Sequence, residues 1–326
     1  MKSSLQRAVT LCQFDMQLVN TCIHENLQSD IMMIPAIGHY IVNSGGKRIR
    51  PLLTLLTARL FGYQGKRHIP LSVVVEFIHT ASLLHDDVVD SSDQRRGVPS
   101  ANGVWGNQAS VLVGDYLFSR SFQMMVADGD MLMLKLMSDV TNALAEGEVL
   151  QLSRTFHLGM TEAECLEVIE RKTAVLFKAA TEVGAHVAGQ SADTIVNMAE
   201  YGMCLGVAFQ LMDDALDYLA EAEDAGKPVG HDLEEGKITL PLIHAMQRDV
   251  SLAARVEIIS ERGCYEDGDR EWVRERVAAQ GGTEYAMRHA KDYAERAKGL
   301  LPEHAADLEM KDLLADLADF SAHRPY

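Results

Sequence analysis

The sequence predicts an all-α protein built as one large helical bundle. Apolar residues recur at steps of three and four positions through most of the 326 residues, and the two-residue alternation of strands is scarce. Hydrophobic residues make up 47% of the chain, which suffices for a large core. No Pro/Ser-rich tract, long charge block or shift in composition marks a linker. We therefore expect a single domain that spans residues 1–326.

Six segments carry the helical period most clearly. In chain order they are residues 71–89, 109–126, 131–152, 163–188, 192–219 and 310–320. Glycine and proline separate the elements at residues 43–46, 62–65, 96–99, 128–130, 226–228 and 281–282. About ten or more helices fit this punctuation, several of them long enough to cross the domain. The third segment opens with a methionine-rich run, residues 131–137, which we interpret first as core and second as the floor of a cavity.

Net charge and cysteine content disfavour several classes of protein. A formal net charge of −17 disfavours binding to nucleic acid and to anionic membranes over most of the surface. The five cysteines are scattered and form no C-x-x-C pair, so neither a disulfide framework nor a thiolate metal site is expected, and a reducing cytoplasm fits. No uncharged apolar run of about eighteen residues and no signal-peptide pattern is present, which predicts a soluble protein and not an integral membrane protein.

Two acidic motifs of one pattern are the strongest functional signal. The first runs from Asp86 to Asp90 (DDVVD), the second from Asp213 to Asp217 (DDALD), and each closes an apolar helical run. Residues four apart share a helix face, so the paired carboxylates repel one another unless a cation lies between them. Mg²⁺ fits, because it takes one or two protein carboxylates and completes its shell with water and phosphate. One copy alone would be read as a solvated helix end, whereas two copies favour a metal-bridged diphosphate.

Basic residues cluster before and after the two acidic motifs. Residues 45–51 (GGKRIRP) join two glycines to three cations, and Arg95 and Arg96 follow the first acidic motif. Lys172 lies in a largely apolar helical segment, and Lys227 and Lys237 follow the second motif. Each alone is explained by an ordinary basic turn or by a snorkelling lysine. Together they can neutralise two diphosphates, Arg in bidentate fashion.

Five sequence blocks carry a resemblance to a known family. They are GGKRIRP at 45–51, EFIHTASLLHDDVVDSSDQRRG at 76–97, the pair Lys172-Thr173, FQLMDDALDY at 209–218 and GKPVGHDLEEGKITLPLIHAM at 226–246. In this order they resemble the trans (all-E) polyprenyl diphosphate synthases, and within that family the bacterial octaprenyl type, from about residue 40 to 250. The resemblance implies a helical bundle around a deep central cavity, of the isoprenoid synthase type, and a homodimer.

The resemblance also implies roles for individual residues. Metal ligands would be Asp86, Asp90, Asp213 and Asp217, with two to three Mg²⁺ ions. Isopentenyl diphosphate would be held by Lys47, Arg50, His79 and Arg96, and the allylic diphosphate by Arg95, Lys172, Thr173, Gln210, Lys227 and Lys237. Of these, Asp86, Asp90, Arg95, Lys172, Asp213 and Lys237 are the expected catalytic residues. Two positions depart from the family pattern: His231 precedes Asp232 where an acid is common, and the C-terminus at 322–326 carries one certain cation.

The reaction implied by the family is a Mg²⁺-dependent head-to-tail condensation. Metal and Arg/Lys charge would stabilise the diphosphate that leaves an allylic substrate such as farnesyl diphosphate. The double bond of isopentenyl diphosphate would attack the allylic cation, and a proton would leave to the released diphosphate. Segments 95–99 and 226–237 are candidate lids that exclude water. We interpret His85 as a helix-end hydrogen-bond partner and Asp115 as a buried acid.

Small residues below the first motif predict a long product. Ala81 and Ser82, with Ile78 a turn further on, lie on the helix that carries Asp86, and Ser82 is ~6 Å beneath it. In short-chain relatives a bulky aromatic resembles a floor at this level. The alternative is that these residues are small only to let a neighbouring helix pack. An octaprenyl product for quinone side chains, such as those of ubiquinone, follows from the likeness.

Rival functions remain to be weighed. A shorter-chain farnesyl or geranylgeranyl synthase would share every motif except the open shaft. A terpene cyclase would share the first motif but typically carries a mixed second motif, and it needs no second diphosphate site. A partner subunit of a two-component prenyl synthase would be an interaction protein, and such subunits tend to lose the aspartate motifs, which are both intact here.

Overall fold

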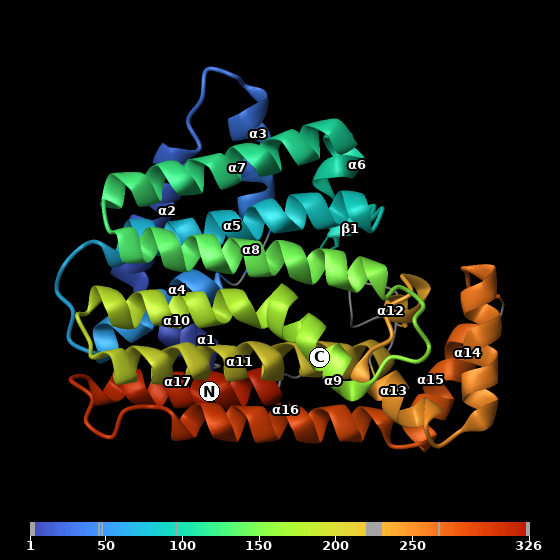
Figure 1. The fold of residues 1–326 in the computed structure, drawn as a ribbon. Helices are drawn as coiled ribbons and strands as arrows, with labels where there is room; N and C mark the ends of the chain where they lie inside the picture. The colour runs from blue at the N-terminus through green and yellow to red at the C-terminus, as the bar shows by residue number, and fades with distance from the viewer. Residues whose placement is uncertain are drawn as a thin grey trace. The chain divides into compact units, whose positions relative to one another are not determined.

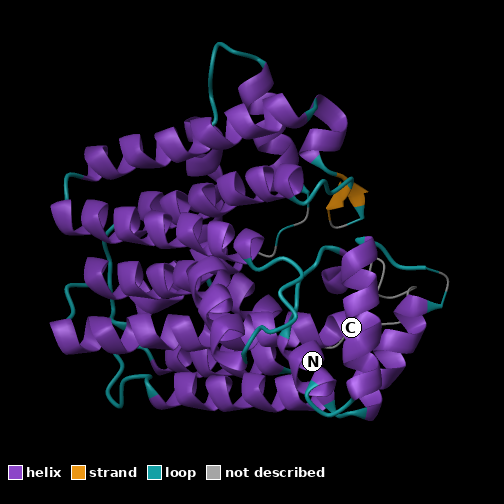
Figure 2. Ribbon diagram, turned by 45° about the vertical axis from the view of Figure 1, so that its right-hand side comes forward, coloured by secondary structure: helices purple, strands orange, loops and turns teal. Residues whose placement is uncertain are grey.

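The computed structural model describes residues 4–44, 46, 48–95, 97–219, 230–266 and 268–323. In this described part the regular structure is helical except for one hairpin, β1 (Gln94–Arg95) and β2 (Val98–Pro99), which pair antiparallel (Figure 2). The predicted all-α class is confirmed. Lys47, Arg96 and Lys227 lie outside the described residues, as do residues 226–229 of the predicted lid and residues 324–326 of the C-terminus.

The helices follow one another along the chain with short connections. Their bounds are α1 (Ser4–Leu11), α2 (Gln13–Asn26), α3 (Met33–Asn43), α4 (Ile49–Leu60), α5 (His68–Val89), α6 (Ala101–Trp105), α7 (Asn107–Asp128), α8 (Met131–Ser153), α9 (Glu162–Ile169), the π-helix η1 (Glu170–Ala174), α10 (Val175–Val187), α11 (Ala192–Leu219), α12 (His231–Glu234), α13 (Leu240–Met246), α14 (Val250–Arg262), α15 (Asp269–Ala279), α16 (Gly282–Gly299) and α17 (Leu308–Ala322).

The described chain groups into two compact units. The first comprises Met1–Thr141, Leu176–Gly202 and Leu300–Leu317, and the second comprises Asn142–Val175, Met203–Gly299 and Ala318–Tyr326. The single domain over residues 1–326 stays a prediction, and each unit is described by itself.

The first unit is organised around α5, which packs against α2, α4 and α7 (Figure 1). Phe77 and Leu84 of α5 and Leu117 of α7 are fully buried between these helices. Gly114 of α7 permits the close approach, because a Cβ there would lie 2.3 Å from Nε2 of His85. The His85 ring instead reaches the backbone O of Val111 at 3.1 Å, which confirms its reading as a hydrogen-bond partner.

The second unit contains α9, η1, α12 to α16 and the second half of α11. Helix α9 starts at a capping box in which the Thr161 hydroxyl accepts the Glu164 N–H and the Glu164 side chain accepts the Thr161 N–H. Helices α13 and α16 pack closely, and Gly282 is required there because a Cβ would fall 2.3 Å from the Pro241 carbonyl oxygen. These contacts fix the helices that carry the candidate site.

The structure shows how far Asp115, the methionine-rich run and helix α11 are buried. Asp115 is exposed, with 61% of its side-chain area accessible, so its reading as a buried acid was wrong: it lies on the outer face of α7. The methionine run is divided, with Met133 and Met137 buried and Met131 exposed. Helix α11 is long and apolar enough to cross a membrane, but 61% of its most apolar window is buried inside the protein, as in a core helix.

Candidate active site

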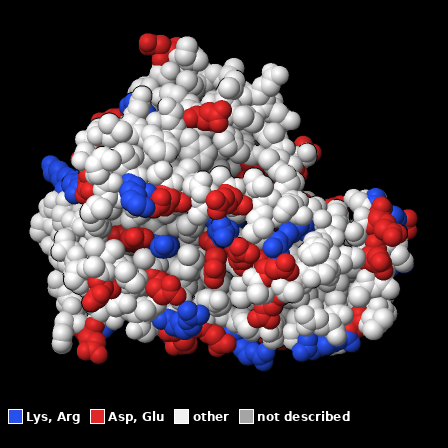
Figure 3. Space-filling view, viewed as in Figure 1, with Lys and Arg blue, Asp and Glu red and all other residues white. Residues whose placement is uncertain are grey.

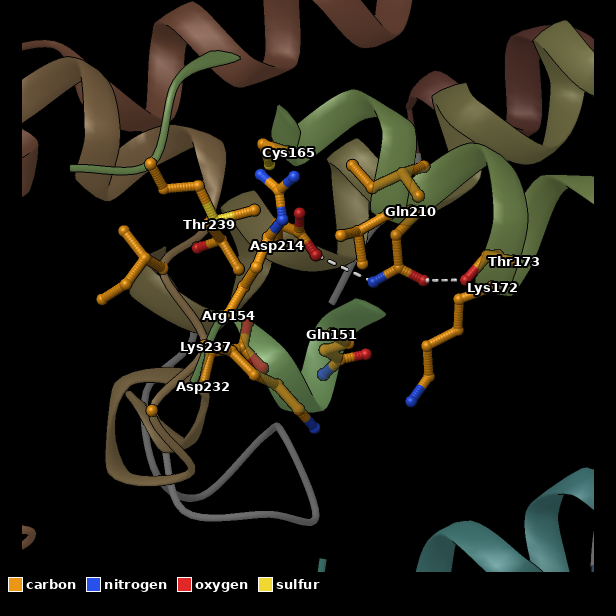
Figure 4. A pocket seen from close by; sticks show the side chains of 15 residues that line it. Gln151, Arg154, Cys165, Lys172, Thr173, Gln210, Asp214, Asp232, Lys237 and Thr239 are labelled. Carbon is orange, nitrogen blue, oxygen red and sulfur yellow. Dashed lines mark hydrogen bonds between the residues drawn. The ribbon is translucent and has the colours of Figure 1, made fainter. Parts of the chain in front are cut away.

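A pocket of about 130 Å³ in the second unit gathers many of the predicted residues (Figure 4). Its polar lining is Gln151, Arg154, Lys172, Thr173, Gln210, Asp214, Asp232, Lys237 and Thr239. Apolar side chains, Met160, Val168, Ile169 and Ile238 among them, complete the wall. Lys172, Thr173, Gln210 and Lys237 were predicted to bind one diphosphate, and the structure brings all four to one cavity.

Lys172 and Thr173 lie on the π-helix η1. A π-turn inserts one residue into a helix, and such turns are common at functional sites because they change the direction of the side chains that they carry. Helix α8 packs directly on this turn at Gly147, where a Cβ would lie 2.8 Å from the backbone of Arg171 and Lys172. The next residue, Glu148, accepts a hydrogen bond from the Lys172 ammonium at 2.6 Å. Local backbone geometry and one ion pair therefore hold Lys172 at the pocket.

A hydrogen-bonded chain crosses the pocket from η1 to the second acidic motif (Figure 4). The Thr173 hydroxyl donates to Oε1 of Gln210 at 3.0 Å, and Nε2 of Gln210 donates to Oδ1 of Asp214 at 2.8 Å. These two bonds fix the orientation of the Gln210 amide and of the Asp214 carboxylate. The middle aspartate of the motif, which carried no role in the sequence reading, thus belongs to the pocket wall.

Carboxyl groups gather at this part of the pocket, with Asp214 and Asp232 in its lining and Asp213 and Asp217 beside Asp214 in the sequence. Burial raises the pKa of Asp214 to about 7, against the lowering effect of the Gln210 bond and with added repulsion from Asp213 and Asp217. Burial also raises the pKa of Asp217, and burial with repulsion from Asp217 and Asp214 raises the pKa of Asp232 well above its ordinary value. Buried carboxylates that repel one another are stabilised by a cation.

This donor set fits a hard divalent cation. Carboxylate oxygens are the ligands that Mg²⁺ prefers, and Mg²⁺ is commonly held by one or two carboxylates plus water and substrate phosphate. Within the described residues no group of three or more His, Cys, Asp or Glu side chains is arranged as a ready-made metal site.

Asp217 contacts the segment that follows it. Its carboxylate oxygens accept the backbone N–H groups of His231 at 3.2 Å and Asp232 at 3.1 Å, at the start of α12. His231, which departs from the family pattern, pairs through Nε2 with Glu235 at 3.1 Å. Glu235 also binds the Lys237 ammonium. Although burial alone would raise it, these partners lower the pKa of Glu235 to about 2. The loop is thus charged and held in place by ion pairs.

The first acidic motif ends α5 in the other unit. Asp86 and Asp90 are half-buried, whereas Asp87 is 1% exposed. The Asp87 carboxylate is bound by the Arg95 guanidinium, with Nη2 to Oδ1 at 2.6 Å and Nε to both oxygens at 2.9 Å. Arg95, predicted on the allylic diphosphate, is therefore already oriented by the second aspartate of the first acidic motif.

The remaining predicted residues of this unit lie on α4 and α5. Arg50, in the first turn of α4, lies over the Phe177 ring with 4.7 Å to its centroid. His79 is half-buried, and its carbonyl accepts the Ser82 hydroxyl at 2.9 Å. Ala81 and Ile78 are fully buried and Ser82 is 8% exposed. Their proposed roles in substrate binding and in product length stay predictions.

Several residues at the site were not predicted from the sequence. Glu148, Gln151 and Arg154 reach the site from α8 and the turn that follows it, while Asp87 and Asp232 lie beside residues that were singled out. Glu148, Gln151 and Arg154 recur at three-residue steps, which places them on neighbouring turns of one face, and that polar face was a usable signal. No signal in the sequence indicated that Glu148 pairs with Lys172, 24 residues away.

Comparison with known proteins places the chain in a family. The polyprenyl synthetase family model matches residues 32–275. Octaprenyl diphosphate synthase of Escherichia coli (strain K12) is 43% identical over 325 residues, which cover 98% of this chain and 99% of that protein. The crystal structure of polyprenyl synthase from Caulobacter crescentus CB15, complexed with calcium and isoprenyl diphosphate, is 42% identical, with a TM-score of 0.94 over 100% of this chain and 99% of that chain.

A second solved structure has a different product in its name. Decaprenyl diphosphate synthase from Rhodobacter capsulatus is also 42% identical, with a TM-score of 0.91 and 98% of both chains covered. Identity alone therefore does not separate an octaprenyl from a decaprenyl product. The matches agree on the family, and the chain accordingly belongs to the polyprenyl synthetase family, as a prenyltransferase that makes long-chain trans-polyprenyl diphosphates.

Proposed function

We propose that the protein extends farnesyl diphosphate with isopentenyl diphosphate to octaprenyl diphosphate, for quinone side chains such as that of ubiquinone, in the cytoplasm. The observation that carries this is the pocket in which Lys172, Thr173, Gln210 and Lys237 converge beside Asp214. A pocket with both cations and repelling carboxylates suits a diphosphate and its metal ions together. The octaprenyl length rests on the relatives and on the small residues Ala81 and Ser82 of α5.

The proposed roles follow the charges of the side chains. Lys172, Thr173, Gln210 and Lys237, with Arg95 and Lys227, would bind the allylic diphosphate, and Lys47, Arg50, His79 and Arg96 would bind isopentenyl diphosphate. Asp86, Asp90, Asp213 and Asp217 would hold two to three Mg²⁺ ions. When bound, Mg²⁺ supplies Lewis-acid stabilisation to the departing diphosphate. The lysine and arginine side chains add fixed positive charge at the oxygens where negative charge develops, without reorganising. No nucleophilic side chain is required.

Water exclusion is the second task of the site. Met160, Val168, Ile169 and Ile238 line the pocket, and apolar walls of this kind keep water away from a reactive cation. Cys165, in the same wall, is buried, and burial raises the pKa of its thiol far above the ordinary value. A neutral thiol is a poor nucleophile, so it does not compete for the cation.

Incubation of the protein alone with Mg²⁺, farnesyl diphosphate and labelled isopentenyl diphosphate tests this function. Chromatography of the dephosphorylated products should give octaprenol as the longest major species. A farnesyl or geranylgeranyl product would favour the shorter-chain alternative, and decaprenol would correct the length. No elongated product would favour the partner-subunit alternative.

A homodimer is the proposed assembly. Helix α7 presents Leu112, Phe122 and Val126 to the outside, and Met131 and Leu132 at the start of α8 are exposed as well. On the face seen in Figure 3, few charged side chains lie over α7. Exposed apolar side chains that cluster on one surface are typical of a protein interface. Light scattering should report twice the mass of one chain; an active monomer would contradict the proposal.

A further inference from the structure

Asp87, the second of the three aspartates in the first acidic motif, points to a different side of the helix from Asp86 and Asp90. Successive residues of a helix are rotated by about 100°, so Asp87 cannot share the face of Asp86 and Asp90. Its side chain is buried, and both of its oxygens are bound by Arg95 at 2.6 to 2.9 Å. A bidentate Arg–carboxylate pair of this kind fixes the plane of the guanidinium.

After α5 the chain turns back, and the residues that follow the helix form hydrogen bonds to the Asp87 carbonyl. Ser91 has a left-handed backbone, with φ of 50°, and the Ser92 N–H donates to the Asp87 carbonyl at 2.9 Å. The Ser91 N–H donates to the Val88 carbonyl at 3.3 Å, which completes a Schellman motif. Asn102 donates to the same Asp87 carbonyl at 3.1 Å. Both the backbone and the side chain of Asp87 thus anchor the segment that carries Arg95.

The pairing leaves part of the guanidinium for a substrate. Arg95 lies in β1, and its contacts to Asp87 use Nε and Nη2. A guanidinium carries five N–H donors, so the edge formed by Nη1 and the second hydrogen of Nη2 is directed away from Asp87. The Arg95 side chain is 19% exposed. This edge has the fork geometry that binds two oxygens of a diphosphate.

We propose that Asp87 is a positioning residue for Arg95, and not a metal ligand as its place in the motif suggests. This inference rests on the proposed function, because it assigns Arg95 to the allylic diphosphate. A free arginine loses rotamer freedom when it binds. Asp87 holds the side chain in one orientation before the substrate arrives, and preorganised charge stabilises a departing diphosphate without a reorganisation cost.

The test compares Asp87→Asn, Arg95→Gln and the double variant. Asp87→Asn keeps the shape but removes the charge, and it should raise KM for the allylic diphosphate roughly tenfold or more, as expected for a lost charge-assisted hydrogen bond. KM for isopentenyl diphosphate and the Mg²⁺ concentration for half-maximal activity should stay unchanged. The double variant should be no worse than Arg95→Gln, because Asp87 acts through Arg95. Calorimetric affinity for inorganic diphosphate should fall in all three variants, equally in Arg95→Gln and the double variant and less in Asp87→Asn, which keeps the Arg95 charge.

Asp128→Asn is the matched control. It breaks the bidentate pair of Asp128 with Arg67, with bonds of 2.7 and 2.5 Å, at the opposite end of α5. It should lower the melting temperature and leave both KM values unchanged. If Asp87→Asn behaved like this control, Asp87 would be structural only. A raised Mg²⁺ requirement that added to the effect of Arg95→Gln would make Asp87 a metal ligand. A wild-type protein that yields no elongated product would instead overturn the proposed function itself.

Discussion

The Lys172 ammonium lies 2.6 Å from Oε2 of Glu148, and the two side chains are 21% and 29% exposed. The pair joins α8 to the π-helix η1 at the edge of the pocket. An ion pair that is largely shielded from water is worth more than an exposed one, and it keeps the lysine from adopting other rotamers. The position of Lys172, which we propose to bind the allylic diphosphate, is thus set by an acid 24 residues away in the sequence.

Removing the charge of Glu148 should release Lys172. Glu148→Gln should weaken binding of the allylic diphosphate by roughly threefold to tenfold and lower kcat, because the free lysine pays an entropy cost on binding. Steady-state kinetics with each substrate varied in turn would measure this. Glu146→Gln is the control, since Glu146 pairs with Arg171 at 2.7 Å on the exposed surface beside it. Equal effects of the two variants would show that the Glu148 pair has no special role.

A methyl group at Gly147 should disturb the π-turn. In Gly147→Ala the new Cβ would meet the backbone of Arg171 and Lys172 at 2.8 Å, and backbone cannot move aside as a side chain can. Overpacking of this kind costs about 1–3 kcal/mol, so we expect a matching fall in the free energy of unfolding, with loss of activity. Denaturant titration measures the first quantity. Gly299→Ala, where a Cβ would meet nothing within 4 Å, should be neutral; a harmless Gly147→Ala would contradict the tight contact.

The helical architecture was predictable, and the exact site was not. The segments 71–89, 131–152 and 192–219 match α5, α8 and α11 within three residues, because long amphipathic helices carry a strong period. The segment 163–188 looked like one helix, whereas the structure breaks it at η1, where tertiary contact with Gly147 and Glu148 selects the π-turn. No local pattern encodes a contact between α8 and a residue more than twenty positions away.

The raised pKa of Asp214 predicts how the stability of the folded protein depends on pH and on Mg²⁺. Its pKa is raised by burial to about 7 in the folded protein, against about 4 in an unfolded chain. The folded state therefore binds the extra proton between these values, so this carboxyl makes the metal-free protein less stable as pH rises from about 4 to 7, with no further change above. Because Mg²⁺ relieves the repulsion, the rise in melting temperature that it causes should grow up to about pH 7 and then level off.

Melting curves with Mg²⁺ and with EDTA between about pH 5 and 9 would check this dependence. Asp214→Asn, which cannot ionise, is the comparison. Without metal, the melting temperature of this variant should rise relative to that of the wild type as pH increases toward 7. A constant difference between the two proteins across this range would show that Asp214 does not titrate there. The Mg²⁺ effect on the variant should be smaller and flatter than on the wild type.

Ser82 is the position at which to test product length. Ser82→Tyr adds a ring about one turn beneath Asp86 on the same helix, and it should shorten the main product to farnesyl or geranylgeranyl length while the first condensation survives. Chromatography of the dephosphorylated products measures this. Thr80→Ser, a small change at a neighbouring buried position, is the control. A folded, active Ser82→Tyr protein that still made the wild-type length would show that the chain grows elsewhere, with Met133 and Met137 the next positions to vary.

We propose that the two aspartate motifs hold the metal that activates the diphosphate. Turnover and melting temperature of Asp86→Ala and Asp213→Ala, measured side by side with Asp193→Ala on the exposed first turn of α11, test it most directly. We expect both motif variants to lose turnover by orders of magnitude while their metal-free melting temperatures stay close to the wild type, because removing a carboxylate from a repelling cluster relieves strain. Asp193→Ala should change neither quantity. A large loss of stability with activity largely retained would contradict the claim and make these aspartates structural.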